Sequence, residues 1–159
     1  MKFRTGIGVD IHRLVEGREL ALGGIIIPHS HGLEGHSDGD ALIHAIIDAC
    51  LGAANLGDIG THFSSEDPCY SGIHSVELLL ETALILARRD WRVEFIDATI
   101  LAERPILRPH IGDMRAALAN ALGIGAESVS LKATTADHLG FVGRREGICC
   151  MAVATITQI

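Results

Sequence analysis

The fold is decided by the stretch "HSDGDALIH" (residues 36–44), which continues as "AIIDACLGAANLG" (residues 45–57). The first part contains the expected start of a helix, and the second part is its strongly apolar body. Most of its positions carry Ala, Ile, Leu or Cys, so the helix that it predicts is apolar all round and must be buried. Asp40, His44 and Asp48 interrupt this pattern at steps of four, which aligns them along the helix. A buried helix tolerates such a polar line if the line serves a metal ion.

The remaining pattern indicates an α+β fold in one domain, residues 1–159, with a mixed sheet and helices packed on one face. Ser37 or Asp38 is the expected N-cap of the first helix, and Ser75 that of the second. The last strand is apolar on both faces, so we expect one face to meet the helices and the other a partner subunit. We expect strands near residues 3–14, 19–28, 91–103, 128–136 and 148–158, and helices near 38–54, 74–90 and 113–124.

The composition limits the classes of function. With 48% hydrophobic residues, 21% charged residues and a net charge of −7, the chain is globular and suited neither to nucleic acid nor to an anionic membrane. No signal peptide or membrane span is predicted. The four cysteines form no CxxC motif, which indicates reduced thiols and a cytoplasmic protein; they are Cys50, Cys69, Cys149 and Cys150.

Asp10 and His12 in "GVDIH" stand two apart on a predicted strand and therefore share one face. With His44 they would supply two imidazoles and a carboxylate, the usual ligand count of a zinc site that keeps one position open. Asp40 or Asp48 could then orient an imidazole. The alternative is a solvated strand face, with His44 as a core histidine hydrogen-bonded to one of these two carboxylates.

Histidines also gather in the Gly-rich loop before the first helix. His29, His31 and His36 could form a metal-binding tract, although an ordinary surface loop is the simpler interpretation. His36 and Ser37 lie next to the helix N-terminus and could hold a phosphate there.

The segment "KATTADHLGFVGRREG" (residues 132–147) is the second candidate for chemistry. Its threonines, its Gly-rich turn and the pair Arg144 and Arg145 could bind phosphate, and Asp137 could hold a hard divalent ion. A hairpin loop with solvated charges is the alternative. Asp58 in "LGDIG" is either a flexible site residue or part of a helix C-cap and turn.

Taken together, "GVDIH", "HSDGDALIHAIIDACLGAANLGDIG", "RPILRPHIGDMR" and "KATTADHLGFVGRREGI" resemble, in order and separation, the 2-C-methyl-D-erythritol 2,4-cyclodiphosphate synthases. The resemblance covers essentially the whole chain. It implies a four-stranded mixed sheet with helices on one face, in a homotrimer with active sites between subunits. The implied reaction is attack by the 2-phosphate of 4-diphosphocytidyl-2-C-methyl-D-erythritol 2-phosphate on its own β-phosphate, with release of CMP.

The resemblance also implies roles for individual residues. Asp10, His12 and His44 would bind Zn²⁺, and a second ion, Mg²⁺ or Mn²⁺, would bridge the substrate phosphates near Asp137. His36 and Thr135 would be catalytic, stabilising the transition state. The other residues expected to bind the substrate or an isoprenoid diphosphate in a central cavity are Ser37, Asp58, Gly60, Phe63, Ala102, Pro105, Leu107, Arg108, Thr134, Phe141 and Arg144.

The chain departs from the family pattern at a few positions. Asp137 stands where the family usually has Glu, and Ala136 where a hydroxyl or amide residue is common. Two other functions therefore remain open at this stage: a metal-dependent phosphohydrolase with the same metal ligands, and a non-catalytic trimer that binds zinc or an isoprenoid diphosphate.

Overall fold

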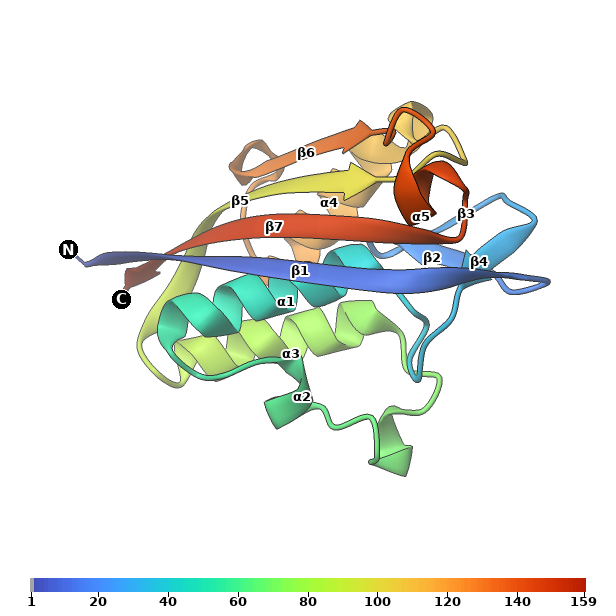
Figure 1. Cartoon of the computed structure of the whole chain (residues 1–159). Helices are drawn as coiled ribbons and strands as arrows, with labels where there is room; N and C mark the ends of the chain where they lie inside the picture. Colours follow the sequence, from blue (N-terminus) through green and yellow to red (C-terminus); the bar gives the residue numbers. More distant parts are fainter. Residues whose placement is uncertain (1) are drawn as a thin grey trace.

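A computed structural model describes residues 2–159 of the chain (Figure 1). The strands are β1 Phe3–Glu16, β2 Leu20–Leu22, β3 Ile25–Ile27, β4 His31–Leu33, β5 Trp91–Leu101, β6 Val129–Thr134 and β7 Gly147–Gln158. The helices are α1 Ala41–Ala54, α2 Ile59–His62, α3 Ser75–Ala87, α4 Ile111–Leu122 and α5 Gly140–Gly143. Short 3-10 turns lie at η1 Pro68–Tyr70, η2 Arg108–His110 and η3 Ala126–Ser128.

The main sheet has five strands in the order β4-β1-β7-β5-β6. Only β5 and β6 run parallel, so the expected mixed sheet is confirmed. The expected number of four strands is wrong because β4 pairs with the end of β1. This strand is three residues long and lies in a Gly-rich segment, which is too short for an alternating pattern to reveal.

Residues 19–28 form a hairpin and not the single strand that we expected. Strands β2 and β3 pair with each other in a separate two-stranded sheet. Gly23 and Gly24 connect them, with φ values of 65° and 79°. Two consecutive residues of positive φ make the tight turn that suits the twist of a hairpin, and glycine adopts this conformation without a Cβ clash.

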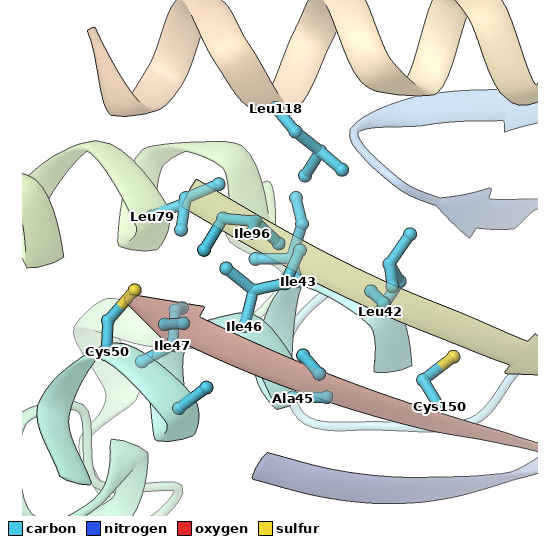
Figure 2. Packing of buried hydrophobic residues seen from close by; sticks show 14 of the residues in the cluster. Leu42, Ile43, Ala45, Ile46, Ile47, Cys50, Leu79, Ile96, Leu118 and Cys150 are labelled. Carbon is cyan, nitrogen blue, oxygen red and sulfur yellow. The ribbon is translucent and has the colours of Figure 1, made fainter. Parts of the chain in front are cut away.

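Helix α1 occupies the centre of the molecule, as its all-round apolar sequence predicts. Every residue of α1 except Asp48 and Gly52 is buried. Figure 2 shows its side chains among those of neighbouring elements, including Leu79 of α3, Ile96 of β5 and Leu118 of α4. The helices α1 and α3 lie along the same face of the sheet (Figure 1), which confirms the predicted one-sided arrangement.

Two predicted helix starts are corrected. The N-cap of α1 is Asp40, whose carboxylate accepts a hydrogen bond from the backbone N–H of Ile43 at 3.0 Å. Ser37 and Asp38 belong to the preceding loop. Ser75 is the first residue of α3 and not its cap, because its hydroxyl is directed toward the α1 region.

The face of the sheet opposite α1 is largely apolar and exposed. Ile7, Val9 and Ile11 of β1 are 65%, 49% and 54% exposed, and Met151 and Val153 of β7 are 41% and 42% exposed. Within residues 2–159, no helix has both the length and the apolar composition required of a membrane span.

Candidate functional site

Three of the predicted ligands, Asp10, His12 and His44, come together between β1 and the first turn of α1. The Asp10 carboxylate oxygen Oδ2 lies 2.7 Å from His12 Nε2 and 3.2 Å from His44 Nδ1. The two imidazole nitrogens are 3.2 Å apart. Within the described chain, this is the one group of three or more metal-ligating side chains whose donor atoms converge.

In each imidazole, the nitrogen that faces away from Asp10 (the outer nitrogen) has a hydrogen-bond partner, and the nitrogen that faces Asp10 is the inner one. His12 Nδ1 donates to the backbone carbonyl of Glu34, which can only accept. His44 Nε2 lies 2.9 Å from Ser75 Oγ and 3.1 Å from Ser37 Oγ. With Nε2–H of His44 donating to a serine hydroxyl, both inner nitrogens present lone pairs to the Asp10 carboxylate.

Three facing lone pairs repel one another, so this arrangement calls for a shared cation, which is a metal ion or, in the metal-free protein, a proton on His12. Ligand atoms around a tetrahedral zinc ion with bonds of about 2.0–2.1 Å are roughly 3.3 Å apart. Two of the three separations, at 3.2 Å, match this spacing, and the third is shorter at 2.7 Å. The residues present therefore fit a divalent metal ion with nitrogen and oxygen ligands.

The predicted orienting carboxylates do not touch the imidazoles. Asp40 is fully buried and accepts from the backbone N–H groups of Gly23, Gly24 and Ile43, so it fastens the β2–β3 hairpin to α1. Asp48 accepts from the N–H of Ile59 at 2.8 Å. Burial raises the pKa of both carboxyls above the usual range.

The orienting role belongs instead to groups that sequence reasoning missed: the Glu34 carbonyl and the Ser75 hydroxyl. A backbone carbonyl leaves no mark in the sequence. Ser75 stands 31 residues from His44, and its place before an amphipathic run predicts only a helix cap.

The metal-free group is electrostatically coupled. Partial burial of Asp10 opposes ionisation, but hydrogen bonds and charge from His12 and His44 outweigh it and lower the pKa of Asp10 to about 2. Burial of His12 likewise opposes its charge, but the contacts with Asp10 and the Glu34 carbonyl raise the pKa of His12 above 6.5.

The loop that carries His36 and Ser37 lies beside this group. Ser37 is buried, whereas His36 is exposed and its Nε2 lies 3.1 Å from the carbonyl oxygen of Asp67. Arg18 donates from Nη2 to the carbonyls of Ser37 at 2.7 Å and Gly35 at 3.3 Å. This guanidinium holds the loop in place, a role without a recognisable sequence motif.

Several of the residues expected to contact the substrate line one cavity of about 520 Å³. Its walls come from the loop between β5 and η2 and from the edge strand β6. The buried Glu103 accepts a hydrogen bond from the N–H of Ala136 at 3.1 Å and so connects the loop after β5 to the segment after β6. The predicted residues among its lining are Ala102, Pro105, Leu107, Arg108, Thr134 and Thr135.

Within one chain this cavity is separate from the metal-ligand group. The strand register aligns Ile11 of β1 with Cys149 of β7, then with Leu101 of β5 and finally with Thr134 of β6. Three strand spacings of about 4.8 Å put the two places roughly 14 Å apart. Asp137 and Thr135 lie on the cavity side, where the N–H of Asp137 donates to Thr135 Oγ1 at 3.3 Å.

The remaining predicted site residues are spread over the surface. Asp58 is the N-cap of α2 and accepts from Thr61, so the interpretation as part of a helix C-cap is wrong; these hydrogen bonds lower its pKa. Gly60 lies in α2, and Phe63 packs edge-on against Tyr70. Phe141 and Arg144 lie at α5, where Arg144 pairs with Glu146.

All four cysteines are unpaired, as the absence of a CxxC pattern predicts. Cys50 and Cys150 are fully buried, and burial raises their thiol pKa values, that of Cys50 to about 12. They are core residues and take no part in the metal-ligand group.

A family model, described as the YgbB family, matches residues 3–157. The chain belongs to the YgbB family. It is 56% identical over 155 residues to 2-C-methyl-D-erythritol 2,4-cyclodiphosphate synthase from Syntrophomonas wolfei. The matched region covers 98% of this chain and 99% of that relative. The match of a family model over nearly the whole chain confirms the resemblance drawn from the sequence motifs.

Solved structures of similar proteins have the same fold. A 2C-methyl-D-erythritol-2,4-cyclodiphosphate synthase in a CDP-bound form is 34% identical, with a TM-score of 0.89 over 97% of this YgbB-family chain and 100% of that chain. The bifunctional IspDF from Campylobacter jejuni is 35% identical, with a TM-score of 0.95 over 99% of this chain. The present chain covers 43% of that longer protein and so corresponds to one part of it.

Proposed function

We propose that this protein is a 2-C-methyl-D-erythritol 2,4-cyclodiphosphate synthase, which converts 4-diphosphocytidyl-2-C-methyl-D-erythritol 2-phosphate to the cyclic diphosphate and CMP. The observation that carries the proposal is the convergence of Asp10, His12 and His44 on one point, with donor atoms 2.7–3.2 Å apart. Family membership and the CDP-bound relative support the substrate class.

The reaction asks little covalent chemistry of the protein. An oxygen of the substrate's 2-phosphate attacks the β-phosphorus, the bond from that phosphorus to the bridging oxygen breaks, and CMP leaves with the bonding electron pair. The 2-phosphate is already ionised near neutral pH, so no general base is needed. The protein's contribution is alignment and charge stabilisation.

The metal centre would supply positive charge to the phosphates. A zinc ion bound by Asp10, His12 and His44 would act as a Lewis acid toward a phosphate oxygen. A second divalent ion, Mg²⁺ or Mn²⁺, fits best near the exposed carboxylate of Asp137, which is a hard oxygen ligand. Such charge would let a chain with a net charge of −7 hold a polyanionic substrate.

Other residues orient the substrate. The loop that Arg18 fastens would present Ser37 and His36 to the β-phosphate, and Thr135 would hold the phosphates from the cavity side. The backbone of the loop from Ala102 to Arg108 would recognise the cytosine. Asp58 and Gly60 of the α2 region would contact the methylerythritol part.

We further propose a homotrimer with active sites between subunits. Two observations support it: the metal-ligand group and the cavity are about 14 Å apart in one chain by strand spacing, and the open sheet face is apolar, with Ile7 at 65% exposure. Packing these faces around a common axis would bury them and bring the cavity of one subunit to the metal ligands of the next. Phe141 and Arg144 would lie near that axis, at the position proposed for an isoprenoid diphosphate.

The experiment is a turnover assay with phosphorus NMR of the product, run on zinc-loaded protein with and without magnesium. The proposal expects CMP and two coupled phosphorus signals of a cyclic diphosphate. The variant His44→Ala should lose zinc and lower the rate roughly a hundredfold or more, since a Lewis acid supplies several kcal/mol. The variant Arg89→Ala, in the exposed turn between α3 and β5, is the control.

The two alternatives predict different products. A phosphohydrolase with water as nucleophile would give inorganic phosphate or a linear product, which would contradict ring closure. A non-catalytic binding protein would leave the substrate intact while still binding zinc and CDP. Either result overturns the proposal.

A further inference from the structure

Two segments that the proposed reaction does not use meet in a second cavity. The histidine-rich segment 29–31, which leads into β4, and the turn after α5 stand more than a hundred residues apart, yet they line the same cavity of about 400 Å³. None of the metal ligands lines it, and neither Phe141 nor Arg144 does. Its lining is Leu14, His29, Ser30, His31, Arg104 and Arg145.

The lining is basic. Two guanidiniums, two imidazoles and one hydroxyl surround the space, Leu14 is its one apolar residue, and no carboxylate contributes to it. Within residues 2–159, the guanidiniums of Arg104 and Arg145 have neither a side-chain hydrogen bond nor an ion pair, in contrast to Arg144, which pairs with Glu146. The donors of Arg104 and Arg145 are therefore available to a ligand.

The positive charge around the cavity affects the neighbouring histidine His29. The rings of His29 and His31 lie 6.0 Å apart, and Ser30 Oγ lies 2.8 Å from His31 Nδ1. Burial lowers the pKa of His29, and the charges of His31 and Arg145 lower it further. An additional cation would be repelled here, so the cavity does not suit the metal-binding tract that the histidines alone suggested.

The backbone at Arg145 adds a second indication. Its φ of 61° is left-handed, a conformation that is strained for residues other than glycine. Glycine would be the more stable choice on conformational grounds. An arginine with this backbone, whose guanidinium lines a cavity and has no ion pair within residues 2–159, is typical of a residue that serves a ligand.

We propose that this cavity is a second anion site, which binds a small diphosphate group separately from the metal centre and the nucleotide cavity. Planar guanidiniums bind phosphate oxygens through two parallel N–H donors, and the serine and histidines add further donors. A volume of about 400 Å³ leaves room for a diphosphate. Arg104 also lines the cavity of about 520 Å³, so the two cavities share a wall.

The test is calorimetric titration of inorganic diphosphate into zinc-loaded protein that is saturated with CDP and free of magnesium. The nucleotide then occupies the cavity at 102–108, and the proposal expects one further diphosphate per chain. Arg145→Gly should weaken this binding at least tenfold, because it removes a charge-assisted contact with the anion. The same variant should keep or increase thermal stability, because it relieves the left-handed backbone.

The control for Arg145→Gly is a second arginine variant outside the cavity. Arg89→Ala removes the same charge from an exposed turn far from the cavity and should leave the titration unchanged. Equal binding by the wild type and Arg145→Gly would overturn the proposal. Release of CDP on addition of diphosphate, followed by phosphorus NMR, would also overturn it, because the anion would then be using the nucleotide site.

Different results would contradict the second anion site and the proposed reaction. If CDP does not bind, the proposed function is contradicted, whereas the difference between the wild type and Arg145→Gly can still be measured on CDP-free protein. If turnover is normal and no second diphosphate binds, only the second site is contradicted.

Discussion

Gly8 of β1 and Ala45 of α1 are in direct backbone contact. A Cβ added to Gly8 would overlap the carbonyl oxygen of Ala45 and would lie 2.8 Å from the amide nitrogen of Ala49. Gly8, Asp10 and His12 share one face of the strand, so this contact brings the two ligands of β1 to His44, one residue before Ala45. The missing side chain at Gly8 thus sets the distance between the strand and the helix that build the metal centre.

Replacing Gly8 by alanine should therefore damage both stability and metal binding. The added methyl group meets backbone atoms on a helix whose residues are nearly all buried, so neither side can move away freely. We expect Gly8→Ala to lower the free energy of unfolding by at least about 2 kcal/mol and to reduce the zinc content. Urea unfolding and elemental analysis would measure the two effects.

Gly52 on α1 provides the control for this substitution. Nothing lies within 4 Å of the place where its Cβ would be. Gly52→Ala should stabilise the protein by about 0.5–1 kcal/mol, because alanine is the better helix former. A Gly8→Ala variant as stable as Gly52→Ala would contradict the close approach of β1 and α1.

The stability of the metal-free protein should depend on pH through His12. Its folded pKa is raised above 6.5 by Asp10, so its contribution is complete below pH 6.5 and is lost as the pH rises through the folded pKa. Asp10 acts in the opposite sense: its contribution is present above pH 3.8 and is lost as the pH falls toward about 2. Unfolding of chelator-treated protein should become easier from about pH 6.5 upward.

Zinc should reverse this trend. The ion must displace the proton of His12, so zinc binding should tighten as the pH rises and should release protons. The stability difference between the zinc-loaded and the metal-free protein should widen with increasing pH. A metal-free His12→Gln variant should have a flatter pH profile, and a profile as steep as that of the wild type would contradict the assignment to His12.

Ser75 should support the metal through His44. Its hydroxyl lies 2.9 Å from His44 Nε2 and fixes the tautomer that leaves Nδ1 free for the ion. Loss of such an outer hydrogen bond typically weakens metal binding by about 10–100-fold, and this is our expectation for Ser75→Ala. Competition with a zinc chelator would measure it. Ser71→Ala, in the exposed loop before α3, should leave the affinity unchanged.

Asp137 should determine the magnesium requirement. Its backbone is left-handed, with a φ of 53°, a conformation that Asn and Asp tolerate better than other side chains. Asp137→Asn therefore removes the charge while keeping the backbone conformation. We expect about tenfold more magnesium for half-maximal turnover, since a charge-assisted ligand is worth about 1.5 kcal/mol or more.

The zinc content of the Asp137→Asn variant should equal that of the wild type, because Asp137 does not belong to the donor group at Asp10. An unchanged magnesium dependence would place the second ion elsewhere.

The sequence by itself determined the parts of this protein that local pattern controls. The apolar run around His44 dictated a buried helix, because only burial removes so much apolar surface from water. The spacing of Asp10 and His12 put both side chains on one strand face, because side chains alternate along a strand. The motifs then pointed to the family before any geometry was known.

The tertiary structure decided what depends on groups far apart in the chain or on the backbone itself. It showed that β4 adds a fifth strand, that Asp40 caps a helix while serine and a carbonyl hold the imidazoles, and that Arg145 faces His29. These pairings have no sequence period, because a hydrogen bond or a cavity wall depends on how the chain folds back on itself. A short strand or a backbone acceptor likewise has no residue type that marks it.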